Sequence, residues 1–228
     1  MTKLLTLLRT FPNARIIPSA FYPVGLLWLS ASVTLAGDLA PVALPAPRVT
    51  SGKPLMQALQ DRQTTRELDR RALTDQVLGD LLWAGFGVNR PGNGHRTAPS
   101  AMNSQEVDLY VARADGLFVY DAPGHRLSTV TGEDVRGRIS GQAFAKEAPV
   151  VLVYVANLAK LTKAKPERKS FYAAIDVGCV VQNIYLYCAS ENLGTVVFDL
   201  DRPPLTEVLR LKPDQEIILA QAVGYPLK

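Results

Sequence analysis

The chain has 228 residues, of which 47% are hydrophobic, and it carries a formal charge of +4 at neutral pH. This length and composition predict one globular domain of ordinary size with a real core. Three of the positive charges, Lys3, Arg9 and Arg15, precede the first acidic residue, so a chain without this leader would carry +1, from 4 − 3. No segment interleaves basic and aromatic residues, and the charge therefore gives no support to a nucleic-acid partner.

Residues 1–36 have the pattern of a secretory signal peptide or an N-terminal anchor. A basic start is followed by a 13-residue apolar run, Val24 to Ala36, which ends in small residues. The run is short for a membrane-spanning helix. A cleaved signal predicts a periplasmic or otherwise exported protein. The alternative is a cytoplasmic protein in which this segment docks on a partner.

Residues 37–54 are rich in proline, with Pro41, Pro45, Pro47 and Pro54. Proline fixes the backbone in a non-helical form, so we expect an extended linker or tether here. The folded domain is expected to occupy residues 55–228.

The order of the elements predicts an α+β sandwich in which helices pack on a mixed, mostly antiparallel sheet. Thr74 is placed to cap a helix that runs to Gly85, and the Gly- and Asn-rich residues after it predict a loop up to His95. The expected strands and hairpin are residues 106–112, 117–121 with 126–130, 150–156 and 217–224, and short helices are expected at 55–59 and 205–211.

The stretch from Ser170 to about residue 193 predicts a long helix, which Ser170 could cap. Asp176 is the only charged residue between Phe171 and Ser190, so we expect both faces of this helix to be buried. In a chain of this length the second face would pack on a partner subunit, which predicts a homodimer. On this interpretation Val180 is an outward, interface position.

The cysteine and histidine residues indicate no metal site. Cys179 and Cys188 lie nine positions apart on the long helix, roughly 13 Å along its axis, which is too far for a disulfide. We expect both to be packed core thiols. His95 and His125 lie in Gly-rich polar surroundings without ligand spacing, so we expect loop histidines rather than metal ligands.

Arg62, Thr64 and Arg66 alternate along the chain. In an extended segment such residues point to one face, and two guanidinium groups beside a hydroxyl make a good anion clamp. The alternative is a solvated charged turn, which the spacing by itself does not exclude.

Five short motifs, taken together and in order, resemble the FMN-dependent nitroreductase family, and they span about residues 55–226. They are Asp61-Arg62-Gln63-Thr64-Thr65-Arg66, Ala98-Pro99-Ser100-Ala101-Met102-Asn103-Ser104-Gln105, Asp176-Val177-Gly178 with Gln182-Asn183, Leu193-Gly194-Thr195, and Val223-Gly224-Tyr225-Pro226. The short chain is also similar to the branch that contains azoline-oxidising dehydrogenases of peptide-modification clusters.

The resemblance implies a homodimer that binds one FMN at each of two interface sites. Arg62 and Thr64, with Gln63 nearby, would hold the phosphate and ribityl end of the cofactor. Arg66 would lie by the pyrimidine edge of the flavin. A fixed cation at that edge stabilises the negative charge of the reduced ring and raises its potential.

The other half of the implied site comes from two further motifs. Pro99 and Ser100 would shape a turn from which Asn103 bonds the flavin ring. The backbone around Val196 and Val197 would face nitrogen-5, where hydride enters and leaves. Hydride transfer itself needs no acid–base side chain, so no catalytic side chain is expected.

The sequence departs from the family pattern in three ways. Family members often carry further basic residues beyond the last strand that complete the phosphate site, and in this chain that cofactor contact would be reduced to Lys228 or absent. Glu106 and Val107 follow Gln105, where many members have proline and an aromatic residue. The domain is also small, with no room for a long lid inserted between the helices.

Two functions remain open from the sequence. The first is an oxidoreductase that takes hydride from NAD(P)H, or from another donor if the protein is exported, and reduces a nitro, quinone or related acceptor. The second is a flavin- or ligand-binding dimer of the same fold without turnover.

Overall fold

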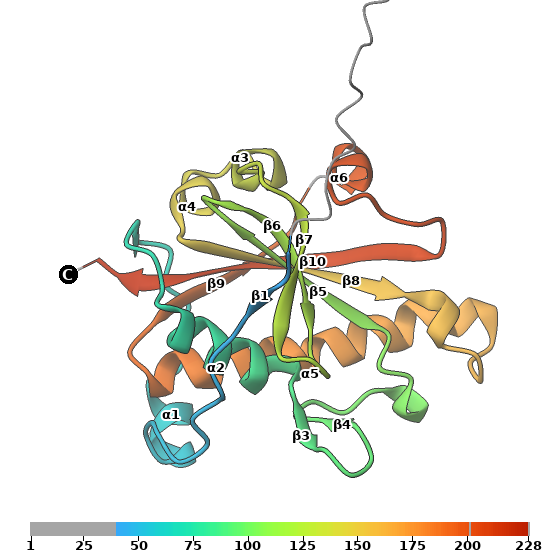
Figure 1. Ribbon diagram of the computed structural model, residues 1–228, viewed down its shortest axis with the longest axis horizontal. Coiled ribbons are helices and arrows are strands. Elements are labelled where there is room, and N and C mark those ends of the chain that lie inside the picture. Colours follow the sequence, from blue (N-terminus) through green and yellow to red (C-terminus); the bar gives the residue numbers. More distant parts are fainter. Residues whose placement is uncertain (1–39, 201, 228) are drawn as a thin grey trace, which may run out of the picture. The chain divides into compact units, whose positions relative to one another are not determined.

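Strand β8 (Val150–Asn157) lies inside the main sheet and divides its side chains between two cores (Figure 1). Leu152 and Tyr154 point into one core, and Val151 and Val153 point into the other. A strand that is apolar on both sides must be covered on both faces. The computed structural model describes residues 40–200 and 202–227, and the central strand that we predicted at 150–156 is confirmed.

Helices cover both faces of this sheet. Side chains of α2 (Asp75–Phe86) and α5 (Lys169–Ser190) form one core with the sheet. Side chains of α3 (Arg136–Ile139), α4 (Ala143–Glu147) and α6 (Arg202–Val208) form the other. This arrangement confirms the predicted α+β sandwich, although the sequence analysis did not predict α3 and α4.

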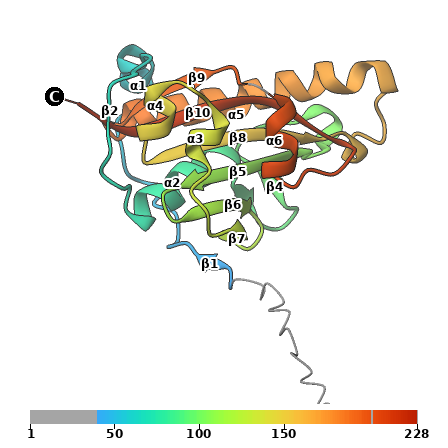
Figure 2. The same cartoon turned by 90° about the horizontal axis from the view of Figure 1, so that it is seen from above.

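The main sheet has eight strands, and every strand pair among the described residues is antiparallel, which confirms the mostly antiparallel sheet. Seven strands follow one another across the sheet in the order β1, β7, β6, β5, β8, β10, β2, as the view from above shows (Figure 2). The remaining strand, β9, pairs with β10. The strands other than β8 are β1 (Val42–Ala43), β2 (Leu68–Asp69), β5 (Val107–Arg113), β6 (Gly116–Asp121), β7 (Arg126–Thr131), β9 (Gly194–Phe198) and β10 (Gln215–Pro226).

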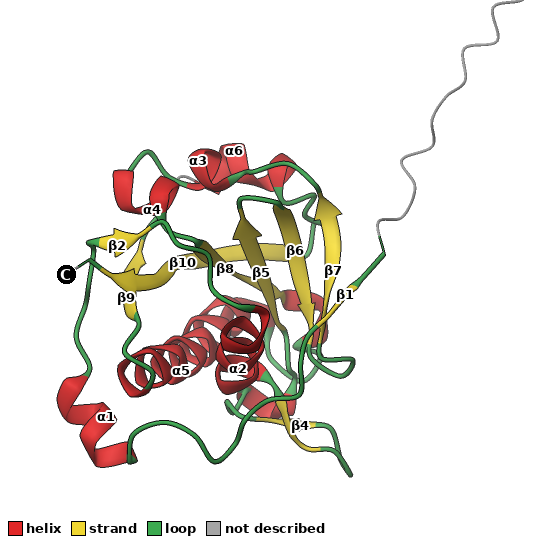
Figure 3. Cartoon of the chain, turned by 60° about the vertical axis from the view of Figure 1, so that its left-hand side comes forward, coloured by secondary structure: helices red, strands yellow, loops and turns green. Residues whose placement is uncertain are grey.

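Helix α5 lies beside α2 beneath the sheet (Figure 3). It begins one residue before the predicted start and ends at Ser190, about three residues short of the predicted end. Ser170 does not cap it, because Ser170 lies inside the helix, where its hydroxyl donates to Glu216 Oε2 at 2.7 Å. The expectation that Val180 points outward was wrong, since its side chain is 0% exposed. The outward face carries Phe171 and Ile175, each 49% exposed.

The cap of α2 is as predicted, because the Val77 N–H donates to Thr74 Oγ1 at 3.3 Å. The loop expected after Gly85 is in part a hairpin of β3 (Val88–Arg90) and β4 (His95–Arg96). The short helices are α1 (Leu55–Asp61), η1 (Ala101–Asn103), η2 (Leu158–Lys160) and η3 (Pro166–Arg168).

Residues 44–54, here called the strap, run from β1 to α1 and pack on the domain instead of forming a free tether. This segment belongs to the same compact unit as the rest of the described chain. The Arg48 guanidinium meets the buried Asp80 carboxylate at 2.7 Å, and the Arg48 backbone N–H donates to the same carboxylate at 2.8 Å. His125 Nε2 lies 2.9 Å from the Pro45 carbonyl, which gives this histidine a structural role. Residues 1–36, predicted as a signal or anchor, lie outside the described residues.

Candidate functional site

The segment 62–67 connects α1 to β2 and lies beside β9. Its anchor is Thr65, whose backbone N–H donates to the Thr195 carbonyl at 2.9 Å. A Cβ added at Gly194 would come within 2.7 Å of Leu68 and 3.0 Å of Thr65. Glycine therefore permits this close approach, and the predicted anion-binding segment is fixed against the strand whose backbone was predicted to face the flavin.

Tyr185 of α5 joins three of the predicted site residues. Its hydroxyl lies 3.2 Å from Thr64 Oγ1 and accepts the N–H of Val197 at 3.2 Å. The guanidinium carbon of Arg62 lies 5.4 Å from the centre of the Tyr185 ring, within reach of a cation–π attraction. The sequence analysis missed Tyr185. A signal was present, because a tyrosine hydroxyl in an apolar helix usually has a hydrogen-bond partner.

Arg62 and Arg66 form no ion pair with any residue in the part of the chain that the structure describes. The nearby Asp61 carboxylate instead accepts hydrogen bonds from Lys53 Nζ and Gln57 Nε2, each at 2.8 Å. The bond from Lys53 holds the pKa of Asp61 below its ordinary value, so this carboxylate is ionised and already has its cation. The two guanidinium groups therefore have no carboxylate partner among the described residues, and the anion clamp stays a prediction.

Buried hydrogen bonds to β10 hold strand β9 in place. The Thr195 hydroxyl donates to the Ala222 carbonyl at 2.8 Å and accepts from Gln221 Nε2 at 2.9 Å, both in the buried interior. Val196 is 1% exposed and packs in the core, whereas Val197 is half-buried. Of the two predicted β9 contacts, Val197 is therefore the one whose backbone the structure ties to Tyr185.

The loop 99–105, here called the PSN loop, leads into β5 and has an unusual backbone. Met102, Asn103 and Gln105 have φ values of 55°, 53° and 49°. This left-handed conformation is uncommon for residues that carry a side chain, and it persists only where the surroundings hold it.

Hydrogen bonds within the PSN loop and to neighbouring segments hold it in place, among them the following. Ser100 Oγ accepts the Gln105 backbone N–H at 2.9 Å, and the Gln105 side chain donates to Asn103 Oδ1 at 3.2 Å. The Ala101 backbone N–H donates to Asp176 Oδ2 of α5 at 2.7 Å. Pro99 and Asn103 are exposed, so the loop presents Asn103 at the surface, as its predicted role requires.

The structure does not bring the two predicted groups of site residues together in one protomer. Arg62, Thr64 and Val197 surround Tyr185, while the PSN loop is bound to Asp176. These two α5 residues are nine positions apart, which places them ~13 Å apart along the helix axis. The two groups are therefore separate clusters at different positions along α5.

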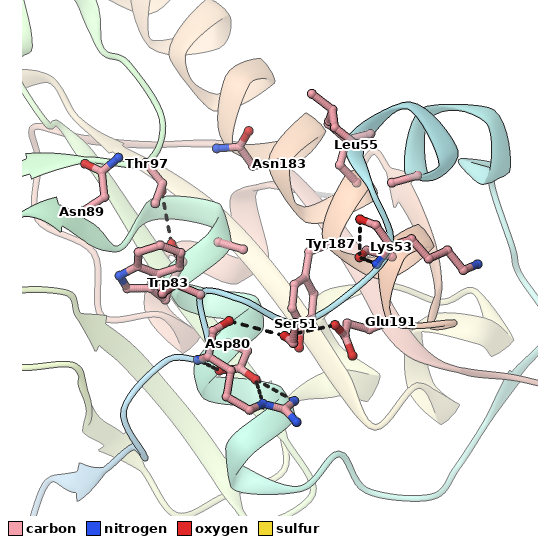
Figure 4. Close-up of a pocket in the computed structure, with 16 residues that line it drawn as sticks. Ser51, Lys53, Leu55, Asp80, Trp83, Asn89, Thr97, Asn183, Tyr187 and Glu191 are labelled. Atoms are coloured by element: carbon pink, nitrogen blue, oxygen red, sulfur yellow. Dashed lines mark hydrogen bonds and ion pairs between the residues drawn. The ribbon is translucent and has the colours of Figure 1, made fainter.

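Two cavities flank the C-terminal half of α5. The first, of about 460 Å³, is lined by Gln63, Thr65 and Tyr185 among others. The second, of about 450 Å³, lies under the strap and is lined in part by Trp83 and Tyr187 (Figure 4). The PSN loop contributes to neither cavity, so within one protomer neither joins the two groups of residues.

A sequence model of the nitroreductase family, which is a family of oxidoreductases, matches residues 59–225. The chain belongs to the nitroreductase family.

Relatives agree with this assignment. The candidate nitroreductase MJ1384 of Methanocaldococcus jannaschii is 31% identical over 169 residues, covering 69% of this chain and 85% of that protein. The structure of a candidate nitroreductase from Ralstonia eutropha has a TM-score of 0.79 at 39% identity, covering 85% of this chain and 93% of that one. A candidate nitroreductase from Desulfovibrio desulfuricans, solved in complex with FMN, shares the fold with a TM-score of 0.56 at 21% identity, covering 78% and 89% of the two chains.

Glu106, where this nitroreductase departs from the family pattern, is 0% exposed. Burial, followed by the neighbouring Asp176 carboxyl, raises the pKa of Glu106 from 4.5 to about 7. Because the folded-state pKa lies above the ordinary value, the stability linked to neutral Glu106 is fully present below pH 4.5 and is lost as the pH rises through about 7. Lys228, the last predicted site residue of this nitroreductase, lies outside the described residues.

Proposed function

We propose that this nitroreductase is an FMN-dependent oxidoreductase that works as a homodimer and passes hydride to a small-molecule acceptor such as a nitro or quinone compound. The observation that supports this most is the separation of the two groups of predicted site residues. Arg62 and Thr64 lie at one end of α5, and Asn103 lies near its middle. We infer that the bound cofactor contacts one group from each of two copies, because each group forms at a different part of α5.

Exposed apolar side chains support a second copy on this surface. Phe171 and Ile175 of α5 are each 49% exposed, and Leu55 and Met56 of the adjacent α1 are 62% and 75% exposed. A Cβ added at Gly178, on the same outward face of α5, would meet nothing within 4 Å. Obligate homodimer interfaces are large and apolar, and small residues allow close helix approach.

The residues present fit FMN. The Arg62 guanidinium forms no ion pair with a described carboxylate and shares Tyr185 with the Thr64 hydroxyl, an arrangement that suits a phosphate. Val197 is half-buried, and its N–H donates to the Tyr185 hydroxyl at 3.2 Å, so this N–H would contact FMN only by exchanging that acceptor for the cofactor. When bound, FMN would supply the hydride-accepting and hydride-donating centre. The chain's own part is to bind and orient it and to place Arg66 where negative charge develops on reduction.

The colour of the purified protein tests the proposal. We expect yellow protein with flavin absorbance that bleaches with NADH, NADPH or, if the protein is exported, only with another donor such as a quinol. Reoxidation by a nitro or quinone compound should then restore the colour. Colour without bleaching by any donor would instead support a flavin-binding dimer without turnover, and colourless protein that takes up no added FMN would contradict the FMN-dependent oxidoreductase.

We also propose export, based on the basic, then apolar, start of the sequence. We expect cell fractionation to place the protein outside the cytoplasm, and N-terminal sequencing to find a mature end near Gly37 if the leader is cleaved. Soluble cytoplasmic protein that retains Met1 would contradict this proposal.

A further inference from the structure

Glu106 lies directly behind the PSN loop, and the cofactor contacts proposed above do not use it. Its side chain is 0% exposed, and neither carboxyl oxygen accepts a hydrogen bond from any described residue. Its backbone is fixed, because the Asn157 N–H donates to the Glu106 carbonyl at 2.9 Å. A buried carboxylate without a partner is strongly unfavourable, so the group must be neutral or must find a donor.

The neighbouring groups offer no such donor. Asp176 of α5 is 5% exposed and uses one oxygen to accept the Ala101 N–H. The positive charge of Lys160 in η2 lowers the pKa of Glu106, but the Lys160 ammonium donates its hydrogen bond to Asp108 Oδ1 of β5, at 2.8 Å. Two carboxyl groups that lie next to each other cannot both be ionised at low cost, and they characteristically share one proton.

We propose that Glu106 is a positioning residue: its protonated carboxyl donates to Asp176, and Asp176 in turn holds the Ala101 N–H and the strained PSN loop. One proton is held between two carboxyl groups, and its loss to solvent leaves two adjacent carboxylates. The repulsion between them weakens the hydrogen bond from the Ala101 N–H to Asp176, which holds the loop. The effect on cofactor binding rests on the proposed function, because it requires that Asn103 contacts FMN.

The strain in the loop explains why it needs such a support. Three residues with side chains, all within four positions, have the left-handed conformation, which is unfavourable unless the surroundings hold it. The Ala101–Asp176 bond is the link between this loop and the core helix. A change in charge at Glu106 therefore acts on the segment that presents Asn103.

Glu106→Gln tests the proposal, because a glutamine amide can donate to Asp176 at every pH. The FMN dissociation constant is measured by flavin fluorescence from pH 6 to pH 8.5 for the unmodified protein, for Glu106→Gln and for the exposed control Glu167→Gln. We expect affinity to fall about ten- to thirty-fold over this range in the unmodified protein and in the control, as one proton with a midpoint near pH 7 requires. Glu106→Gln should lose this dependence. The titration of the FMN phosphate itself is common to all three proteins.

A second measurement separates this proposal from the proposed function. The hydrogen-exchange protection factor of the Ala101 amide is measured without FMN over the same pH range. It should fall with rising pH in the unmodified protein and stay level in Glu106→Gln. If the Ala101 protection factor shows this difference between the two proteins, but neither protein binds FMN, the proposed function fails and the role of Glu106 stands. A pH dependence of Ala101 protection that is the same in both proteins, or a Glu106→Gln protein with an unprotected Ala101 amide at pH 6, would overturn the inference.

Discussion

Val180→Asp is expected to prevent folding, whereas Ile175→Asp is expected to give a folded monomer that no longer retains FMN. Val180 is 0% exposed in the core shared with α2 and the sheet, and Ile175 is 49% exposed on the outward face of the same helix. An unpaired charge in the core costs several kcal/mol against a total stability of about 5–15 kcal/mol. The same charge at Ile175 meets water in the protomer and meets apolar surface only in the dimer.

Thermal unfolding and sedimentation equilibrium distinguish the two outcomes, with Ile175→Val as the conservative control. We expect Ile175→Val to remain dimeric and yellow. A dimeric, FMN-loaded Ile175→Asp protein would show that this face is not the interface. An unmodified protein that is a stable monomer at micromolar concentration would exclude the proposed dimer altogether.

Arg62→Ala and Arg66→Ala are expected to change different properties of the protein. Arg62 lies over the Tyr185 ring, beside Thr64, and is proposed at the phosphate. A charged hydrogen bond of this kind contributes about 1.5–3 kcal/mol, so its loss should weaken FMN binding roughly ten- to a hundred-fold. Arg66 is proposed at the pyrimidine edge, so its loss should lower the reduction potential in protein that still holds FMN.

Flavin fluorescence gives the affinity, and a dye-linked redox titration of loaded protein gives the potential. Arg70→Ala is a suitable control, because Arg70 is nearby in the chain and forms an exposed ion pair with Glu147. That variant should match the unmodified protein in both measurements. If Arg62→Ala and Arg66→Ala also keep the unmodified affinity and potential, the assignment of the two arginines is wrong.

The regular elements follow from local sequence wherever one signal dominates. Thr74 caps α2 because its hydroxyl accepts the Val77 N–H, a local contact that spacing reveals. Strand β8 is readable because both of its faces are apolar. The short helices α3 and α4 escape prediction, because segments of four and five residues have too little periodicity of their own and are stabilised by packing.

The sequence alone did not show which side chains of α5 point into the core and which point outward. Phe171, Ile175, Val177 and Val180 are all apolar, so hydrophobicity could not distinguish the inward from the outward positions. Packing against α2 and the sheet decides that Val180 is buried and Ile175 is half-exposed. The proline-rich residues 44–54 show the same division. Their extended backbone could be predicted from the prolines, but their packing on the domain could not, because the Arg48–Asp80 ion pair joins residues 32 positions apart.

The fold class, the family motifs and their order could be predicted from residue types and from spacing along the chain. How the motifs meet depends on the tertiary fold. It placed Tyr185 against Arg62, Thr64 and Val197, set the PSN loop ~13 Å away along α5, and buried Glu106 beside Asp176. These contacts join residues far apart in sequence, and their energies depend on burial and distance, which exist only once the chain has folded.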